Sequence, residues 1–276
     1  MSAGPDTLDE LATRLDRAAV SGSAIPQLGL HERMDEQAAY EVQHRVVRLR
    51  EERGDPVIGM KLGFTNQAKA AQMGVFDVIA GSLTAGMRVG DGEVLDLGGL
   101  IHPRVEPELA FLLRRDVDLS GGAETPFTEA VAAVAPALEI IDSRYRDFSF
   151  SLQDVIADNT SASRFVLGPW VPLGGPGDCA QSGALDARGL ANLGVSLDID
   201  GEVAATGSTA AILGHPVRAY DACCRMARRF GFALPAGSIL LAGAATVAVP
   251  LAGATTAAVR VARVGSASLR VSKGDE

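Results

Sequence analysis

Three glutamates in two apolar segments are the strongest candidates for chemistry in this chain of 276 residues. Glu106 and Glu108 lie in the segment Val105–Leu113, and alternate residues of a strand point to the same face. Two neighbouring carboxylates that face a core repel each other and are costly to desolvate, and a hard cation removes that cost. For these two residues alone, the alternative is a solvated strand end, where glutamates are common.

Glu139 lies in a second apolar segment, Ala135–Ile141, whose composition favours burial. A buried carboxylate needs a cation or hydrogen-bond donors. Three carboxylates without histidine or cysteine in either segment favour a site of oxygen ligands, and hence Mg²⁺ or Mn²⁺ rather than Zn²⁺ or Cu²⁺. Spacing along the chain does not establish that Glu139 meets the other two.

Two basic residues are further candidates. Lys61 stands in an apolar strand, where a buried lysine becomes a tunable acid, a base or an anion anchor unless it extends to the surface. Arg164 follows a polar, turn-forming segment and begins an apolar run, so its guanidinium could point inward toward a carboxylate. The polar residues before it also fit turns and caps. Asp142 and Arg144 could equally form a structural ion pair with each other rather than take part in a site.

The composition limits the classes of partner. The net charge of −9 and the absence of a long basic cluster argue against nucleic acid. Three cysteines give no disulfide framework, and the N-terminus lacks the pattern of a secretion signal, so we expect a cytoplasmic protein. The apolar stretch 239–259 is broken by glycine and proline, which favours two buried strands and a turn over a membrane span.

Periodicity and turn residues predict the elements that would position these side chains. We expect helices at 8–20, 35–53, 66–72, 128–138 and 216–230, and loops and turns over 74–92. We expect strands at 57–63, 93–97, 105–113, 192–199, 239–241, 257–264 and 267–271. The pattern is that of an α+β fold, with a helical part over 1–56 and a β-rich catalytic body over 57–276 in one domain.

Five motifs occur in an order that resembles a known family. They are Gly59–Thr65, Val105–Glu108, Leu138–Arg144, Ile156–Asn159 and Leu213–Pro216. Together they resemble the hydratase/decarboxylase branch of the fumarylacetoacetate hydrolase superfamily over nearly the whole chain. The resemblance implies a mixed β-roll core with peripheral helices and a Mg²⁺ or Mn²⁺ site at Glu106, Glu108 and Glu139. It also implies a functional Lys61 and a homo-oligomer, which in decarboxylases of this kind is associated with a partner hydratase.

Within this branch, the run from Ile141 to Val166 looks more like the decarboxylases. That likeness implies metal-dependent loss of CO₂ from 2-oxohex-3-enedioate in aromatic meta-cleavage catabolism, with Ser161 and Arg164 contacting the substrate. The alternatives are hydration of 2-hydroxypenta-2,4-dienoate and a non-catalytic binding module of the same fold. The chain departs from the family at Ala85, near which an aspartate is common.

Overall fold

The first two helices begin at residues that can cap them. The computed structural model describes residues 7–30, 34–66, 77–120, 125–174 and 185–273. Helix α1 (Leu8–Ser21) starts with a capping box between Thr7 and Glu10 and ends at Gly22, which has a left-handed φ of 60°. Helix α2 (Glu36–Glu52) starts at Asp35, whose side chain accepts the N–H of Ala38. Both helices agree closely with the predicted ranges.

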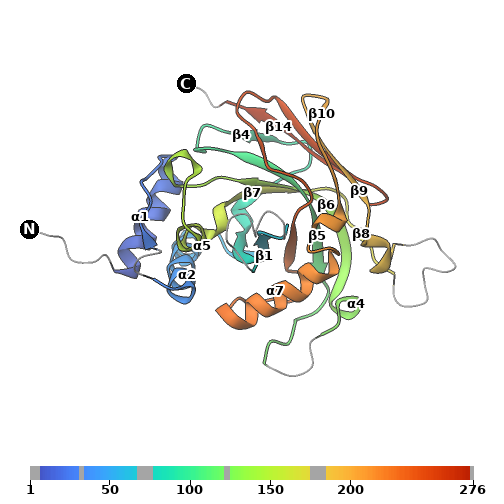
Figure 1. The fold of residues 1–276 in the computed structure, drawn as a ribbon, viewed down its shortest axis with the longest axis horizontal. Helices are drawn as coiled ribbons and strands as arrows, with labels where there is room; N and C mark the ends of the chain where they lie inside the picture. The colour runs from blue at the N-terminus through green and yellow to red at the C-terminus, as the bar shows by residue number, and fades with distance from the viewer. Residues whose placement is uncertain (1–6, 31–33, 67–76, 121–124, 175–184, 274–276) are drawn as a thin grey trace, which may run out of the picture.

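Two β-sheets form most of the remaining fold (Figure 1). Among the described residues the larger sheet has nine strands: β1 (Val57–Gly63), β2 (Ile79–Thr84), β3 (Arg88–Val89), β5 (Arg104–Leu113), β6 (Val131–Ile141), β7 (Ala162–Leu167), β8 (Val171–Pro172), β11 (Ile239–Ala244) and β12 (Val249–Pro250). The smaller sheet consists of β4 (Val94–Asp96), β9 (Gly194–Ile199), β10 (Glu202–Ser208), β13 (Thr256–Val261) and β14 (Gly265–Ser272).

Strand pairing in both sheets is mixed. The main path of the larger sheet is β2–β1–β11–β5–β6–β7–β3, in which β1 pairs with β11 in parallel and β5 with β6 antiparallel. The smaller sheet has the order β10–β9–β13–β14–β4 and packs against β6. The α+β prediction, with a mixed β core and peripheral helices, is confirmed. The stretch 239–259 forms strands separated by turns, as predicted, but only β11 is buried throughout most of its length, whereas β12 and β13 are partly exposed. No helix in the described part of the chain is both long and apolar enough to cross a membrane.

Two predicted elements are wrong. The segment predicted as a helix at 128–138 has only one helical turn, α4 (Phe127–Ala130), and then becomes strand β6. Its alanines favour a helix, but β6 pairs with β5 on one side and β7 on the other and is buried on both faces, so its sequence lacks the alternation of a half-exposed strand. The segment 74–92, predicted as loops, contains the fully buried strand β2. The helix predicted at 66–72 lies, after Asn66, outside the described residues.

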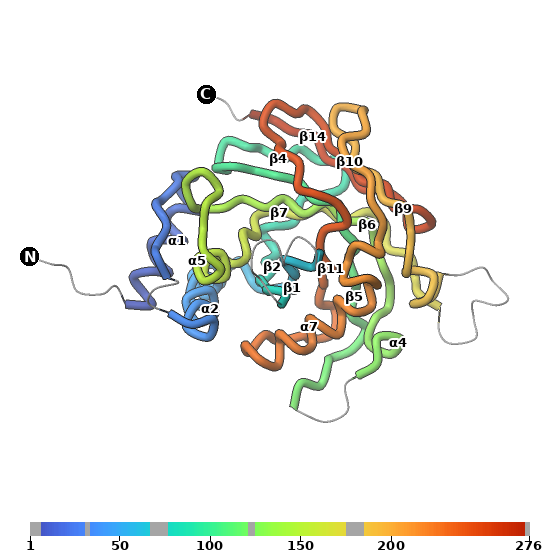
Figure 2. The backbone as a smooth tube through the Cα atoms, viewed as in Figure 1, coloured from blue at the N-terminus to red at the C-terminus, as the bar shows by residue number. Residues whose placement is uncertain are grey.

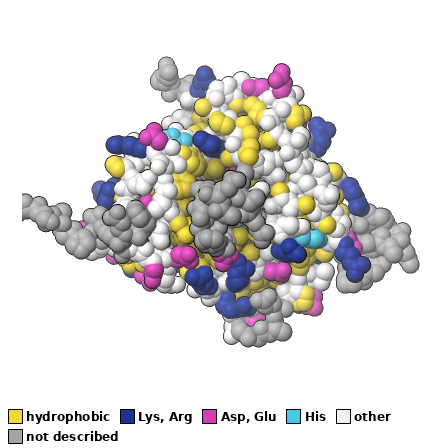
Figure 3. Space-filling model, viewed as in Figure 1, with side chains coloured by type: hydrophobic (Ala, Val, Ile, Leu, Met, Phe, Trp, Pro, Cys, Tyr) yellow, Lys and Arg dark blue, Asp and Glu magenta, His cyan; other side chains and the backbone are white. Residues whose placement is uncertain are grey.

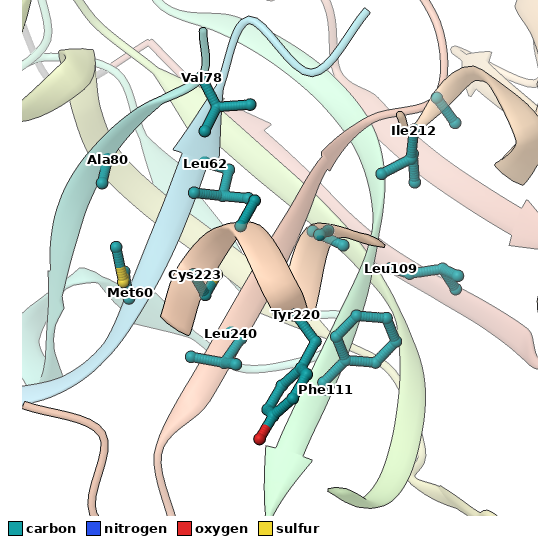
Figure 4. Close-up of a cluster of buried hydrophobic side chains, with 14 of the residues drawn as sticks. Met60, Leu62, Val78, Ala80, Leu109, Phe111, Ile212, Tyr220, Cys223 and Leu240 are labelled. Atoms are coloured by element: carbon teal, nitrogen blue, oxygen red, sulfur yellow. The ribbon is translucent and has the colours of Figure 1, made fainter. Parts of the chain in front are cut away.

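Helix α7 (Val217–Phe230) covers one face of the larger sheet (Figure 4). Its buried stripe includes Tyr220 and Cys223, which lie over Phe111 of β5 and Leu240 of β11. The Tyr220 hydroxyl donates a hydrogen bond to the carbonyl of Thr125 at 2.7 Å, so this phenol is satisfied at the edge of the core. With this face covered by a helix, the opposite face of β1, β11, β5 and β6 is left for polar side chains.

Helix α2 lies beside α5 (Leu152–Ala157) at the β2 edge of the sheet (Figure 2). The buried Gln43 amide of α2 donates to the carbonyl of Ala80 in β2 and to that of Ile156 in α5, at 2.9 and 2.7 Å. A buried amide that joins three elements fixes their spacing, because leaving either carbonyl unpaired is costly.

A left-handed turn follows α5. Asn159, Thr160 and Ser161 have φ angles of 49°, 54° and 55°, a conformation that costs about 1–2 kcal/mol per residue. The Asn159 side chain accepts the N–H of Ser82 at 2.8 Å and donates to its carbonyl at 2.9 Å, so it pairs with β2 as a neighbouring strand would. The Thr160 hydroxyl donates to the carbonyl of Ala80 at 2.7 Å.

A buried ion pair holds the other side of this turn. Arg144 pairs with Asp158 and also donates to the carbonyls of Asp158 and Ala162. Burial raises the pKa of Asp158 to about 6, and the Arg144 guanidinium opposes that shift. The sequence left open an ion pair between Asp142 and Arg144; in the structure Arg144 pairs with Asp158, and Asp142 accepts the N–H groups of residues 101 and 102.

Replacing Gly81 with alanine tests how strictly this turn is held against β2. A Cβ at Gly81 would lie 2.6 Å from the carbonyl oxygen of Asn159, which is backbone and cannot rotate away. We expect Gly81→Ala to lower the free energy of unfolding by roughly 2 kcal/mol or more. Urea denaturation measures this. The control is Gly194→Ala, where the added Cβ meets open space; equal stability losses in the two variants would contradict the prediction.

Candidate active site

The three glutamates meet on one face of the larger sheet. Glu106 of β5 lies directly opposite Glu139 of β6, and Glu108 lies two residues further along β5. Directly paired residues, and residues two apart on one strand, share a face. One carboxylate oxygen from each residue therefore lies within 4.8 Å of the others. The solvated strand end is excluded, because Glu108 and Glu139 are each only 1 % exposed.

The donor set fits a cation. Glu108 Oε2 accepts the N–H of Gly243 at 2.8 Å, whereas Glu108 Oε1 and both oxygens of Glu139 are buried without a hydrogen-bond donor. Buried carboxylate oxygens without donors are unfavourable. Three of them in one cluster, with no nitrogen or sulfur ligand in it, match the coordination that Mg²⁺ and Mn²⁺ prefer.

Lys61 projects into the same cluster from β1. Its Nζ is buried, donates to the carbonyl of Thr160 at 3.1 Å and lies 3.1 Å from Glu139 Oε1. Lys61 and Glu139 therefore form a buried ion pair. Burial acts to lower the pKa of Lys61, but the carboxylates of Glu139, Glu106 and Glu108 outweigh it and raise that pKa above its usual value. Lys61 is therefore a buried ammonium and not a surface lysine.

The electrostatics of Glu108 also favour a cation. Burial and then the neighbouring Glu139 carboxylate raise the pKa of Glu108 well above its usual range, and Lys61 only partly opposes this. A divalent ion would reverse the local field and stabilise the ionised form of Glu108.

Two cavities reach Glu106. The larger, of about 440 Å³, is lined by Lys61, Gly63, Phe64, Ile79, Glu106, Ile141, Phe148, Ser149, Phe150, Val155, Thr160 and Ser161. The smaller, of about 160 Å³, shares Gly63, Phe64 and Glu106 and adds Thr65, Asn66 and Thr246. Ser161 Oγ is buried without a partner beside the larger cavity, so it can bind a ligand there. A cavity of about 620 Å³ at the start of β1 has no such carboxylate cluster, so size does not mark the site.

Arg164 is not brought to this cavity. It lies opposite Ile140 in the β6–β7 pairing, whereas Phe165 lies opposite Glu139, so Arg164 is on the other face of the strand. It lines a separate cavity of about 330 Å³ with Arg50, Asp55 and Asp142, and donates to the carbonyl of Ser163. The inward guanidinium predicted from the sequence therefore exists, but it faces away from the glutamates.

The comparisons with known proteins agree with this geometry. No protein-family model matches the chain. A 4-oxalocrotonate decarboxylase from Pseudomonas sp. is 48 % identical over 244 residues, which cover 88 % of this chain and 89 % of the relative. The chain belongs to the hydratase/decarboxylase branch of the fumarylacetoacetate hydrolase superfamily.

Other members of this branch support both the fold and the site's chemistry. A 2-keto-4-pentenoate hydratase from Burkholderia vietnamiensis is 35 % identical over 87 % of each chain. The structure of 4-oxalocrotonate decarboxylase from Pseudomonas putida G7, complexed with magnesium and adipate, has a TM-score of 0.84 and 32 % identity, and the match covers 98 % of this chain and 99 % of that one. The branch therefore contains enzymes of two reaction types on one fold.

Several wall residues could not be recognised from the sequence. Ile79, Phe148 and Phe150 line the cavity, but each comes from a segment that looks like ordinary core or loop. Ala85, where the chain departs from the family, begins a short 3₁₀ turn, η2 (Ala85–Met87), and lines neither cavity.

The carboxylate cluster predicts a metal-dependent stability. Mg²⁺ at a hundredfold excess over its Kd stabilises the folded state by about 2.7 kcal/mol, which corresponds to a rise of roughly 5–10 °C in Tm for a chain of this size. Glu108→Gln should melt at or above the wild-type temperature without metal, because repulsion is relieved, and should lose most of the Mg²⁺-dependent rise. Thermal melting with and without Mg²⁺ measures both effects; a rise of equal size in both proteins would contradict the assignment.

The position of Arg164 gives a second prediction. We expect Arg164→Met to change KM by less than about twofold, because the guanidinium lies on the face away from the cavity. Steady-state kinetics of the variant provide the measurement. A rise in KM of roughly tenfold or more, with the Mg²⁺-dependent melting shift retained, would place Arg164 back in the substrate site.

Proposed function

We propose that this protein is a divalent-metal-dependent carboxy-lyase that converts 2-oxohex-3-enedioate into 2-hydroxypenta-2,4-dienoate and CO₂. The observation that carries the proposal is the cluster of Glu106, Glu108 and Glu139 with Lys61 beside a cavity of about 440 Å³. The choice of substrate rests on the 48 % identity to a 4-oxalocrotonate decarboxylase.

Glu106, Glu108 and Glu139 would hold Mg²⁺ or Mn²⁺ through one carboxylate oxygen each, and these oxygens lie within 4.8 Å of one another. When bound, the cation supplies Lewis-acid polarisation of the substrate's 2-oxo group. Lys61 has three N–H donors, of which one is directed to Thr160 and one faces Glu139, and it lines the cavity. The third donor is available to an oxygen of the substrate.

The reaction needs a sink for one electron pair. The C5–C6 bond breaks, its electron pair forms the C4–C5 double bond, and the conjugated system delivers charge to the 2-oxo oxygen while C6 leaves as CO₂. The resulting dienolate takes up one proton at that oxygen to give the dienol. Lys61, as a buried ammonium, is placed to stabilise this charge by hydrogen bonding and to deliver the proton.

Ser161 is the other polar side chain that we assign to substrate binding. Its hydroxyl is buried, has no protein partner and lines the cavity beside Lys61. We place no substrate contact on Arg164, because it lines a different cavity.

Hydration of 2-hydroxypenta-2,4-dienoate is the second candidate, because hydratases of this branch are 35 % identical to the chain. Both reactions pass through a dienolate that the same cation and Lys61 would stabilise. Two assays separate the decarboxylase from the hydratase: release of CO₂ from 2-oxohex-3-enedioate, and addition of water to 2-hydroxypenta-2,4-dienoate. Activity on the dienoate alone would establish the hydratase instead.

A change at Lys61 tests the proposed chemistry. We expect Lys61→Met to lower kcat for CO₂ release by roughly 10²–10⁴-fold, since it removes the proton donor at the developing oxyanion. The Mg²⁺-dependent rise in Tm should remain, because the carboxylates are unchanged. Retention of more than a tenth of the wild-type kcat would rule out Lys61 as the acid, and complete loss of metal response would point to a structural role instead.

Four further features stay predictions: one domain over 1–276, a cytoplasmic location, a homo-oligomer and association with a partner hydratase. Small dicarboxylic acids are the expected ligands, as adipate is for the Pseudomonas putida G7 decarboxylase.

On the face shown in Figure 3, acidic and basic side chains are interspersed with apolar ones.

A further inference from the structure

One wall of the larger cavity is formed by apolar side chains. Phe64, Ile79, Phe148, Phe150 and Val155 line it. Of the described residues that line this cavity, only Lys61 and Glu106 carry charge. Arg104 lies with its guanidinium 5.0 Å from the ring centroid of Phe148, but it does not line the cavity.

This apolar wall is built against local backbone preference. Phe64 and Phe148 have φ angles of 58° and 55°, in the left-handed region that bulky residues rarely adopt. Such conformations persist only where the surrounding structure holds them, and they concentrate at functional sites. Gly63 permits close packing here, because a Cβ on it would lie 2.9 Å from Thr160 and 3.0 Å from Ile79.

The two cavities that meet at Glu106 differ in size. The smaller is bordered by Thr65, Asn66 and Thr246, whose polar groups suit a hydrated carboxylate. A 2-oxo acid held at the cation by its first two carbons therefore has a space of about 160 Å³ on one side and a space of about 440 Å³ on the other. The larger cavity has room for the remaining carbon chain, and its wall of apolar side chains lies along that path.

On this basis, which rests on the proposed decarboxylase function, we infer that the departing carboxylate lies against the apolar wall and that its poor solvation there promotes its loss. This apolar wall then determines both which reaction takes place and which substrate is accepted. It is formed by Phe64, Ile79, Phe148, Phe150 and Val155. The carboxylate is anionic in the bound substrate and becomes neutral CO₂, while its electron pair moves to the 2-oxo oxygen near Lys61. An apolar surface disfavours the anionic carboxylate but does not disfavour neutral CO₂.

A cationic clamp on the departing carboxylate would have the opposite effect. It would stabilise the ground state more than the transition state, and so lower KM and kcat together. The position of Arg164 on the far face of β7 is consistent with a site that avoids such a clamp.

Ser149 allows a direct test, because it is exposed and lines the cavity, so substitutions there should not disturb the core. Ser149→Lys introduces a cation, and Ser149→Met introduces a side chain of similar length without charge. With Mg²⁺ and 2-oxohex-3-enedioate, we expect Ser149→Lys to lower kcat for CO₂ release roughly tenfold and to lower KM. Ser149→Met should change each constant less than about threefold.

Two non-reacting analogues test the placement independently. 2-Oxoadipate carries the distal carboxylate on a saturated chain, and 2-oxohexanoate lacks it. We expect wild-type enzyme to bind 2-oxohexanoate at least as tightly as 2-oxoadipate, measured as competitive inhibition constants. Ser149→Lys should reverse that order, and Ser149→Met should not.

Unchanged kcat in Ser149→Lys, or wild-type binding of 2-oxoadipate more than about tenfold tighter than that of 2-oxohexanoate, would overturn the inference while leaving the decarboxylase function standing. Absence of CO₂ release by the wild-type enzyme, with hydration of the dienoate, would overturn the proposed function itself. The two failures are therefore distinguishable.

Discussion

The structure depends on bringing three carboxylates together on a buried sheet face. Glu106, Glu108 and Glu139 carry a formal charge of −3 and Lys61 contributes +1, so the cluster has −2 before any ion binds. That is the charge a divalent cation neutralises. The sheet can impose this arrangement because β5 and β6 pair in a fixed register, in which a slip of one residue would turn the glutamates to the opposite face.

The elements around the cluster are connected to it through one strained turn. Asn159 pairs with β2, Arg144 pairs with Asp158 at the start of the turn, and the turn presents its Thr160 carbonyl to Lys61. Helix α2 joins the same assembly through Gln43, which bonds to β2 and α5. The N-terminal helices thus support the position of the lysine although none of their residues lines its cavity. A change in their packing would reach the site through this turn.

Local strand periodicity predicts part of the carboxylate cluster but not the contacts between strands or the residues that surround the cluster. Alternation in β5 predicted that Glu106 and Glu108 share a face, because the strand period of two is local. The contact with Glu139 is a register between strands and needed either the family resemblance or the fold. Strand β6 was mistaken for a helix, since burial on both faces removes the alternation that marks a strand. The side-chain direction of Arg164 could not be predicted either, because a shift in register between β6 and β7 lies just before it.

Decarboxylases and hydratases of this branch share a fold, and their reactions share a dienolate, so the carboxylates and Lys61 cannot distinguish them. What must differ is how the site treats the far end of the substrate. A decarboxylase gains from leaving the carboxylate on C5 poorly solvated, whereas a hydratase must admit water and orient it toward the neighbouring C4. In this chain that end is bordered by three phenylalanines, of which Phe64 and Phe148 have left-handed backbone conformations, and Ser149 lies between Phe148 and Phe150 in the sequence. A wall of this composition excludes ordered water more readily than it positions it, which is a physical reason, separate from sequence identity, to favour loss of CO₂ over addition of water.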